Sequence, residues 1–318
     1  MLTDQKRDHG GGLDAAIVKF GGERIGWIDL STGINPHPYP VTELPPDAWN
    51  ALPDSGAEAA LLSAARRLWR VPAGADLIAA PGASALIAQI PGLAAADAVA
   101  IPGPTYNEHA AAFSAQGWQV VDSGAATARV VVHPNNPNGR LWTADTLPAG
   151  TAGLTVIDES FCDVCPERSL IGAAARPGTL VLKSFGKFWG LAGLRLGFAA
   201  GDPALVARLR ERLGPWAVSG PSLAIGARAL GDPDWARATR ARLAEDSARL
   251  DALMLRAGAH CLGGTTLFRL YEVDSAADWQ ERIARHRIWS RIFPYNPRWL
   301  RLGLPHALHW PRVEAALA

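Results

Sequence analysis

A repeating pattern between residues 70 and 200 constrains the fold more than any other feature of the sequence. Short apolar runs end there at turn-forming or polar residues, and helical patterns separate several of them. The runs are DLIAAPGAS, DAVAIPGP, WQVVDSG, ARVVVHPNNPNG, LTVIDES, TLVLKSFGK and LRLGFAAG. Strands interleaved with helices indicate an α/β layer around a largely parallel sheet. We therefore expect a large α/β domain over residues 41–219.

The pattern changes after Pro221. Residues 233–259 predict one long amphipathic helix, with leucines gathered on one side and charges elsewhere. The remaining tail holds two strand-like runs, TTLFRLYEV and RWLRLGL, around a helix. We expect residues 220–318, together with residues 1–40, to form a smaller α+β domain.

Composition excludes several classes of partner. The chain has 318 residues, 48% of them hydrophobic, and 31 basic against 30 acidic side chains. Such a balance does not favour nucleic acid or an anionic membrane as a partner. Prolines interrupt the most apolar stretch, residues 76–104, and the N-terminus is polar, so we expect no membrane span and no signal peptide. The sequence therefore indicates a soluble cytoplasmic protein.

The three cysteines are too few for a disulfide framework. Two of them, Cys162 and Cys165, form a C-x-x-C pair. Because no second pair completes a zinc site, we expect no metal centre and assign this pair no functional role.

The most informative polar residue is Lys187, just past the TLVLKS run. Ser184 precedes it by three residues and Arg195 follows it by eight. In apolar surroundings the pKa of a lysine falls, and the neutral amine can attack an aldehyde. Arg195 and Ser184 would supply donors to a phosphate. The alternative is a surface lysine and arginine at a strand end.

Other polar residues also follow predicted strands, where open α/β sheets bind ligands. Asp158 ends an apolar strand and requires a cationic partner, such as a protonated pyridinium, unless it caps the next helix. Asn136 lies in a turn-forming cluster, which by itself indicates only a turn. Residues 82–84 join a strand to a helix whose N-terminus could bind phosphate. Tyr106 could stack on a cofactor ring or be a half-buried core residue.

Taken in this order, these residues resemble the fold-type-I pyridoxal-phosphate proteins of the class I/II aminotransferase superfamily. The resemblance implies that Lys187 carries pyridoxal 5'-phosphate (PLP) as a Schiff base and moves protons, with Asp158 and Tyr106 completing the catalytic group. The implied cofactor contacts are Asp158 to the ring nitrogen, Asn136 to the phenolic oxygen, Tyr106 to the ring face, and Ala83, Ser84, Ser184 and Arg195 to the phosphate. Arg301, in LRLGL, would bind a substrate carboxylate, and Arg291 a second anion.

Two N-terminal segments narrow the resemblance. DHGGG at residues 8–12 and IDLSTGINPHPYP at residues 28–40 resemble the threonine-phosphate decarboxylases of cobalamin biosynthesis. That family implies that the N-terminal segment covers the active site, with His9, Gly10 and Asn35 contacting a small phosphorylated amino acid. It also implies decarboxylation of O-phospho-L-threonine to (R)-1-amino-2-propanol O-2-phosphate, and a homodimer. For His9 the alternative is a terminal tail without a ligand.

Two other functions stay open. GPWAVSGPS at residues 214–222 is shared with the histidinol-phosphate aminotransferases. The same cofactor supports transamination if a different bond of the substrate is aligned with the ring, which depends on where Arg291 and Arg301 hold its anions. Phe161 stands where many aminotransferases have a tyrosine, which disfavours this alternative. The second open function is that of a catalytically silent cofactor-binding protein, which the presence of Lys187 and Asp158 disfavours.

Overall fold

The computed structural model describes residues 9–147 and 153–318, so residues 1–8 of the expected covering segment lie outside the described residues. The chain divides into two compact units. The larger contains Pro38–Asn136 and Arg140–Arg240, and the smaller contains the chain up to His37, Pro137–Gly139 and Ala241–Ala318. The larger unit therefore extends beyond residue 219, the boundary expected from the sequence. The reason is that the helix after residue 219 packs within it.

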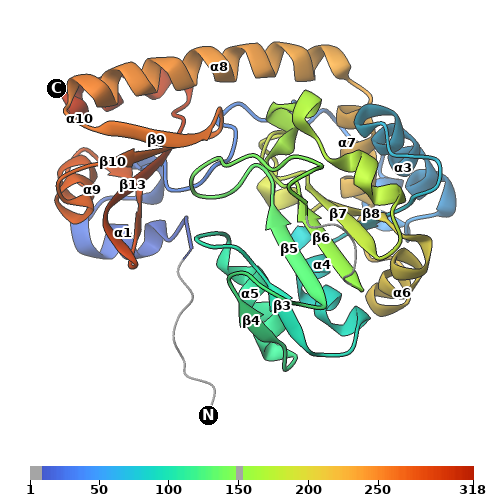
Figure 1. Ribbon diagram of the computed structural model, residues 1–318. Helices are drawn as coiled ribbons and strands as arrows, with labels where there is room; N and C mark the ends of the chain where they lie inside the picture. The colour runs from blue at the N-terminus through green and yellow to red at the C-terminus, as the bar shows by residue number, and fades with distance from the viewer. Residues whose placement is uncertain (1–8, 148–152) are drawn as a thin grey trace. The chain divides into compact units, whose positions relative to one another are not determined.

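A seven-stranded sheet forms the centre of the larger unit, in the order β2-β8-β7-β6-β5-β3-β4 (Figure 1). All seven apolar runs predicted as strands are found in it. Their bounds are β2 (Asp76–Ala80), β3 (Ala98–Ala100), β4 (Gln119–Val121), β5 (Ala128–Val132), β6 (Leu154–Asp158), β7 (Thr179–Ser184) and β8 (Gly197–Gly201). The expected α/β fold with a mostly parallel sheet is confirmed.

Strand β8 is the exception to the parallel arrangement, since it runs antiparallel to both β7 and β2. The connection from β7 to β8 contains one short 3-10 helix, Ala192–Leu194, and no crossover α-helix. A parallel return to the same sheet usually needs such a helix, so this short connection reverses the chain instead. The reversal places Lys187 and Arg195, which both lie in the connection, at one edge of the sheet.

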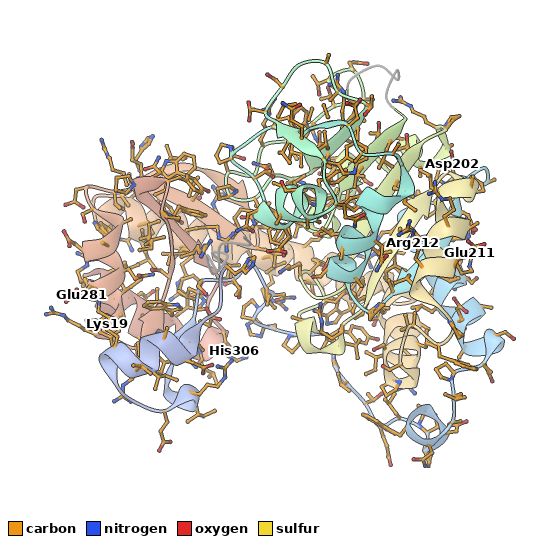
Figure 2. The ribbon with its side chains drawn as sticks, turned by 90° about the horizontal axis from the view of Figure 1, so that it is seen from below. Lys19, Asp202, Glu211, Arg212, Glu281 and His306 are labelled. Carbon is orange, nitrogen blue, oxygen red and sulfur yellow. The ribbon has the colours of Figure 1, made fainter. Side chains whose placement is uncertain are left out.

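Helices cover both faces of this sheet. Residues of α4 (Ala83–Gln89), α5 (Asn107–Ala115) and α6 (Pro203–Leu213) share one buried apolar cluster with Ala199 and other strand residues. The neighbouring strand residue Phe198 points the opposite way and packs edge-on against Trp69 of α3 (Ser55–Trp69). Helix α7 (Gly220–Leu230) packs along α3, and α2 (Asp47–Asn50) lies at the start of α7. Asp202 begins α6 by accepting the Ala204 N–H at 2.8 Å (Figure 2).

The smaller unit is built on a four-stranded antiparallel sheet, in the order β12-β13-β10-β9. These strands are β9 (His260–Thr265), β10 (Phe268–Glu272), β12 (Arg291–Phe293) and β13 (Asn296–Gly303). A second, two-stranded sheet pairs β1 (Ile28–Asp29) with β11 (Ile288–Trp289) in parallel. The sequence predicted two strands in this tail. It missed β11 and β12, which are only two and three residues long, and it missed β9 because HCLGGT contains two glycines and lacks a regular apolar alternation.

The helices of the smaller unit are α1 (Leu13–Phe20), α9 (Ala276–Ala284) and α10 (Trp310–Leu317). Lys19 of α1 lies near Glu281 of α9, with Nζ and Oε2 3.9 Å apart (Figure 2). The predicted long helix is α8 (Pro233–Arg256), which belongs to the larger unit as far as Arg240. Within the described ranges no helix is both long and apolar enough to span a membrane.

Candidate active site

The strand registers of the larger sheet bring the ends of several strands to one edge of the sheet. Ser184, the last residue of β7, pairs with Gly197 of β8, and Gly197 pairs with Ala80 at the end of β2. On the other side of β7, Asp158 ends β6 and pairs with Val132, the last residue of β5. The loops that follow β2, β5, β6 and β7 therefore lie side by side, and these loops carry most of the residues predicted to bind a cofactor.

Asp158 is buried, with only 2% of its surface exposed, and it has two partners. His109 of α5, which is equally buried, lies 2.8 Å from Oδ2, and Ser160 donates its hydroxyl and its backbone N–H to Oδ1. Burial alone would raise the pKa of Asp158, but the hydrogen bond and charge of His109, with the bonds from Ser160, hold that pKa below its ordinary value. Asp158 is therefore a carboxylate at neutral pH. It does not cap the next helix, whose N-cap is Phe161.

Lys187 stands in the turn that follows β7, and large aromatic side chains anchor this turn on both sides. Phe185, Phe188 and Trp189 are completely buried. The Trp189 ring stacks on Phe185 at a centroid distance of 5.5 Å and on Trp235 of α8 at 5.2 Å. Because these rings are held on either side of it, the backbone of Lys187 has little freedom to shift.

The buried carboxylate of Asp163 ties this turn to the segment after β6. It accepts the Trp189 indole N–H at 3.1 Å and the Trp69 indole N–H at 2.9 Å. In the same segment as Asp163, the Phe161 ring centroid lies 5.6 Å from Nζ of Lys187. The residue where many aminotransferases have a tyrosine is thus next to the lysine.

The predicted phosphate contacts lie around Gly82. This glycine has a positive φ of 88° and is the N-cap of α4, so the backbone N–H groups of Ala83 and Ser84 open that helix. The Arg195 guanidinium lies against it, because a Cβ added to Gly82 would be only 2.6 Å from Nη2. Gly197 lies so close beneath the nitrogen of Ala83 that a side chain there would collide with it. The structure thus gathers a guanidinium and helix-terminal N–H groups at one point.

Asn136 and Tyr106 lie in two loops that are joined through a neighbour, Asn135. Asn135 is buried, accepts the Thr105 hydroxyl at 2.5 Å and donates to the Pro104 carbonyl at 3.0 Å. Asn136 itself is half-buried in the turn after β5, and Tyr106 is the half-buried N-cap of α5. The first asparagine of the N-N-P motif is therefore structural, and the ligand roles of Asn136 and Tyr106 stay predictions.

In the smaller unit, two predicted substrate arginines are cross-strand neighbours. Arg291 of β12 is paired in register with Arg301 of β13. Arg291 donates to the carbonyl of His9 at 2.5 Å, and the buried Arg301 donates to the carbonyl of Ser31 at 2.6 Å. Gly10 packs so closely on Ser31 that a side chain would collide with its carbonyl oxygen. Four of the five predicted substrate residues therefore gather at one place, where two guanidiniums can hold anions.

The fifth, Asn35, is held by other residues. It is buried at 2% exposure, and its Oδ1 accepts hydrogen bonds from Nη2 of Arg242 at 3.1 Å and from the backbone N–H of His37 at 3.0 Å. Two donors on Oδ1 determine which way the amide faces, since Nδ2 can only donate.

Comparison with known proteins identifies the family. The model of aminotransferase class I and II matches residues 26–309. The chain belongs to the class I and II aminotransferase family. It is 43% identical to a threonine-phosphate decarboxylase of Sinorhizobium sp., over 98% of this chain and 97% of that protein. It is 38% identical to a threonine-phosphate decarboxylase of Pseudomonas aeruginosa, again over 98% and 97%.

A solved structure of the histidinol-phosphate aminotransferase from Sinorhizobium meliloti, in complex with pyridoxal-5'-phosphate, shares the fold. Its TM-score is 0.80 at 20% identity, over 96% of this chain and 93% of that one. At this identity the likeness is one of fold alone, and it agrees with the fold type I expected from the sequence.

Sequence reasoning missed three buried residues of this site: His109, Asp163 and Lys183. His109 is three residues past Tyr106, one helical turn along α5, and that spacing was the available signal. The Lys183 ammonium pairs with Glu159 at 2.5 Å and lies 3.8 Å from Asp163. Lys183 and Asp163 left no comparable signal, because their partners are distant in the sequence.

Proposed function

We propose that this chain is a PLP-dependent decarboxylase that converts O-phospho-L-threonine to CO2 and (R)-1-amino-2-propanol O-2-phosphate, a step of cobalamin biosynthesis. The observation that carries the proposal is the likeness, over 98% of the chain, to two proteins named threonine-phosphate decarboxylases. The gathered site residues support it, since an ionised Asp158, Lys187 and Arg195 follow neighbouring strands of one sheet.

The residues present fit PLP. Asp158 stays ionised in a buried position, as a partner for a protonated pyridinium must. The Arg195 guanidinium lies against Gly82 at the N-terminus of α4, where a side chain would collide with Nη2, so donors suited to a phosphate lie together there. Ser184, Ala83, Ser84 and Arg195 would hold that phosphate, Asn136 the phenolic oxygen and Tyr106 the ring face.

The chemistry that bound PLP would supply is an electron sink for the α-carbon of an amino-acid substrate. Asp158 supports this by keeping the ring nitrogen protonated, and His109 keeps Asp158 charged. Lys187 would hold the cofactor, and its Nζ is placed to supply the proton that the α-carbon needs after decarboxylation. Arg291 and Arg301 bind the carboxylate and phosphate of the substrate, while Asn35 and the backbone at His9 and Gly10 complete the contacts. These anchors decide which bond of the α-carbon is aligned for cleavage.

A histidinol-phosphate type of aminotransferase is the second candidate. It would use the same larger unit and the same cofactor contacts. Phe161 lies beside Lys187 without a hydroxyl, which disfavours this candidate because many aminotransferases have a tyrosine there.

The test uses the purified protein with PLP. Borohydride reduction followed by peptide mapping is expected to attach the cofactor to the peptide containing Lys187. O-phospho-L-threonine is expected to release CO2 without an oxo acid, and Lys187→Ala to abolish that release. Lys19→Ala, an exposed lysine on α1, is the matched control that keeps activity. Turnover that requires 2-oxoglutarate and histidinol phosphate would instead establish the aminotransferase.

We also propose that the enzyme is a homodimer. The support is a set of large apolar side chains that stay exposed around α2 and before α7 in the larger unit, namely Val41, Trp49, Leu52 and Trp216. Trp49 is 68% exposed and Trp216 60%, and apolar exposure of this kind marks interaction surfaces. Light scattering is expected to give twice the mass of the chain, and Trp49→Glu to shift the mass toward the monomer.

We place the enzyme in the cytoplasm. The support is that Cys162, Cys165 and Cys261 are all free thiols, as is usual in a reducing compartment. Cell fractionation with an antibody to the tagged chain is expected to find it in the cytosolic fraction, and recovery in the periplasm would contradict the assignment.

A further inference from the structure

The C-x-x-C pair is a chemical group that the proposed function does not use. Cys162 opens the 3-10 helix Cys162–Val164, and Cys165 ends it. The Cys165 N–H donates to the Cys162 carbonyl at 2.9 Å, and the Cys162 thiol lies 3.8 Å from the Cys165 carbonyl. Such a closed turn keeps the two α-carbons within the range that a disulfide spans.

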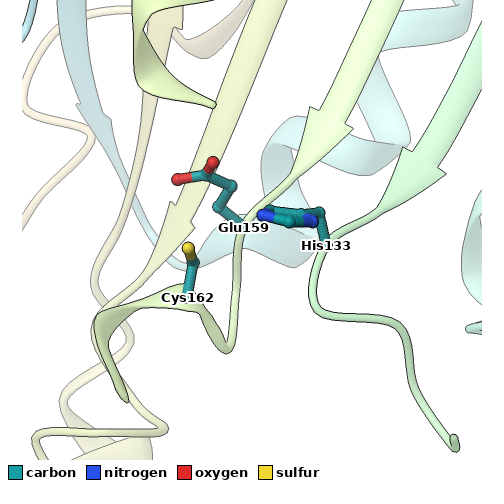
Figure 3. Close-up of side chains that lie close together, drawn as sticks. All are labelled: His133, Glu159 and Cys162. Carbon is teal, nitrogen blue, oxygen red and sulfur yellow. The ribbon is translucent and has the colours of Figure 1, made fainter. Parts of the chain in front are cut away.

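The surroundings of Cys162 do not favour a metal ion. The potential ligand atoms of His133, Glu159 and Cys162 all lie within 4.8 Å of one another (Figure 3). However, Nδ1 of His133 accepts a backbone N–H at 3.0 Å, and Nε2 lies 2.7 Å from a backbone carbonyl, to which it donates. Glu159 is paired with the buried ammonium of Lys183 at 2.5 Å. Both ring nitrogens of His133 and the carboxylate of Glu159 are therefore occupied by hydrogen bonds or an ion pair. The remaining reactive groups of this cluster are the two thiols.

The two thiols differ in a way that suits disulfide exchange. Cys162 is completely buried, and the hydrogen bond between its side chain and that of Cys165, together with burial, raises its pKa. Cys165 is half-buried, and the hydrogen bond from Cys162 lowers its pKa despite the opposing effect of burial. Cys165 is thus the more exposed thiol and the one that ionises more readily, so it attacks first, and Cys162 is the thiol that resolves.

This turn is also connected to Lys187. Phe161, directly before Cys162, lies 5.6 Å from Nζ of Lys187, and Asp163, directly after it, binds the indole of Trp189. A disulfide would fix the side-chain torsions of Cys162 and Cys165, and this constraint would reach Phe161 and Asp163, which flank Cys162 in the chain. We propose that Cys162 and Cys165 form a redox-active dithiol whose closure to a disulfide lowers the activity at Lys187.

The reaction balances with a small-molecule disulfide as oxidant. The Cys165 thiolate attacks one sulfur of glutathione disulfide, and one glutathione thiolate leaves. Cys162 loses its proton to solvent, attacks Sγ of Cys165 and expels the second glutathione. The two protein thiols lose two electrons, and the glutathione disulfide is reduced to two thiols.

The experiment titrates the holoenzyme with mixtures of reduced and oxidised glutathione. Oxidation is expected to lower the protein mass by two hydrogens, to reduce the free thiols from three to one, and to link Cys162 to Cys165 in one peptide. Decarboxylase activity is expected to fall about tenfold and to return with dithiothreitol. Cys261→Ser is expected to respond in the same way, and Cys165→Ser to keep full activity in oxidant.

Either of two results overturns the proposal: no internal disulfide at any glutathione ratio, or a disulfide that leaves the rate unchanged. The effect on rate rests on the proposed function, whereas thiol counting and peptide mapping do not. A protein that binds no PLP but still forms the disulfide would therefore refute the proposed enzyme and the control of Lys187, while retaining the dithiol chemistry.

Discussion

Replacing Trp189 with phenylalanine tests whether Asp163 positions the Lys187 turn. The substitution keeps an aromatic ring for the stacks on Phe185 and Trp235 but removes the indole N–H that donates to Asp163 at 3.1 Å. Trp69→Phe is the matched control. It removes the second indole N–H from the same carboxylate, at 2.9 Å, but Trp69 belongs to α3 and not to the Lys187 turn.

The structure sets the expected size of both effects. A hydrogen bond to a charged group contributes about 1.5–3 kcal/mol, and the smaller ring leaves a cavity that costs roughly 1 kcal/mol more. Each variant is therefore expected to lose about 2.5–4 kcal/mol of unfolding free energy. Only Trp189→Phe loosens the turn that carries Lys187, so it alone is expected to lower kcat, by about tenfold.

Urea denaturation measures the stability of both variants, and CO2 release measures kcat. The pH dependence of the cofactor's absorbance supplies an independent reading of the surroundings of Lys187. Equal losses of kcat in the two variants would show that Asp163 acts only through stability. No loss of kcat in Trp189→Phe would show that the turn does not need this bond.

Three further predictions concern other parts of the molecule. Gly82→Ala is expected to weaken PLP binding at least about tenfold in an equilibrium titration, because its φ is positive and the new Cβ would meet Arg195. His109→Phe is expected to cost the apoprotein about 3 kcal/mol near neutral pH. That cost should vanish in denaturation experiments as the pH falls through the lowered pKa of Asp158, because the protonated acid no longer needs its partner. The pKa of His37 is lowered from 6.5, mainly by burial and further by neighbouring positive groups. Protonation of His37 therefore opposes folding, and the folded state loses stability as the pH falls below 6.5. His37→Gln should therefore lose less stability on acidification than the parent chain.

Local patterns in the sequence predicted the strands and the order of the site residues well. Each strand of the larger sheet is a short apolar run bounded by turn residues, and that signal needs no knowledge of the fold. The same holds for Lys187, Asp158 and Arg195, which lie at strand ends recognisable from the sequence. What local patterns could not predict was the reversal of β8, because strand direction depends on which strands become neighbours.

The C-x-x-C pair illustrates the opposite case. In the sequence, Cys162 and Cys165 lack a partner motif, and their spacing alone predicts no functional role. The structure places them in a turn whose neighbouring residues, Phe161 and Asp163, lie close to Lys187 and bind Trp189. The proposed redox role follows from that placement and not from the spacing.

By itself, the sequence determined the fold class, because that depends on the periodicity of apolar residues. Its motifs also indicated the family by resemblance and predicted the residues that would hold PLP. Only the tertiary structure decided which neighbouring side chain contacts and supports each of these predicted residues. His109 keeps Asp158 ionised, Asp163 anchors the turn of Lys187, and Arg291 meets Arg301 across two strands. The physical reason is that burial and hydrogen bonding depend on contacts between segments far apart in the chain, and these contacts determine both the charge of a carboxylate and the position of a lysine.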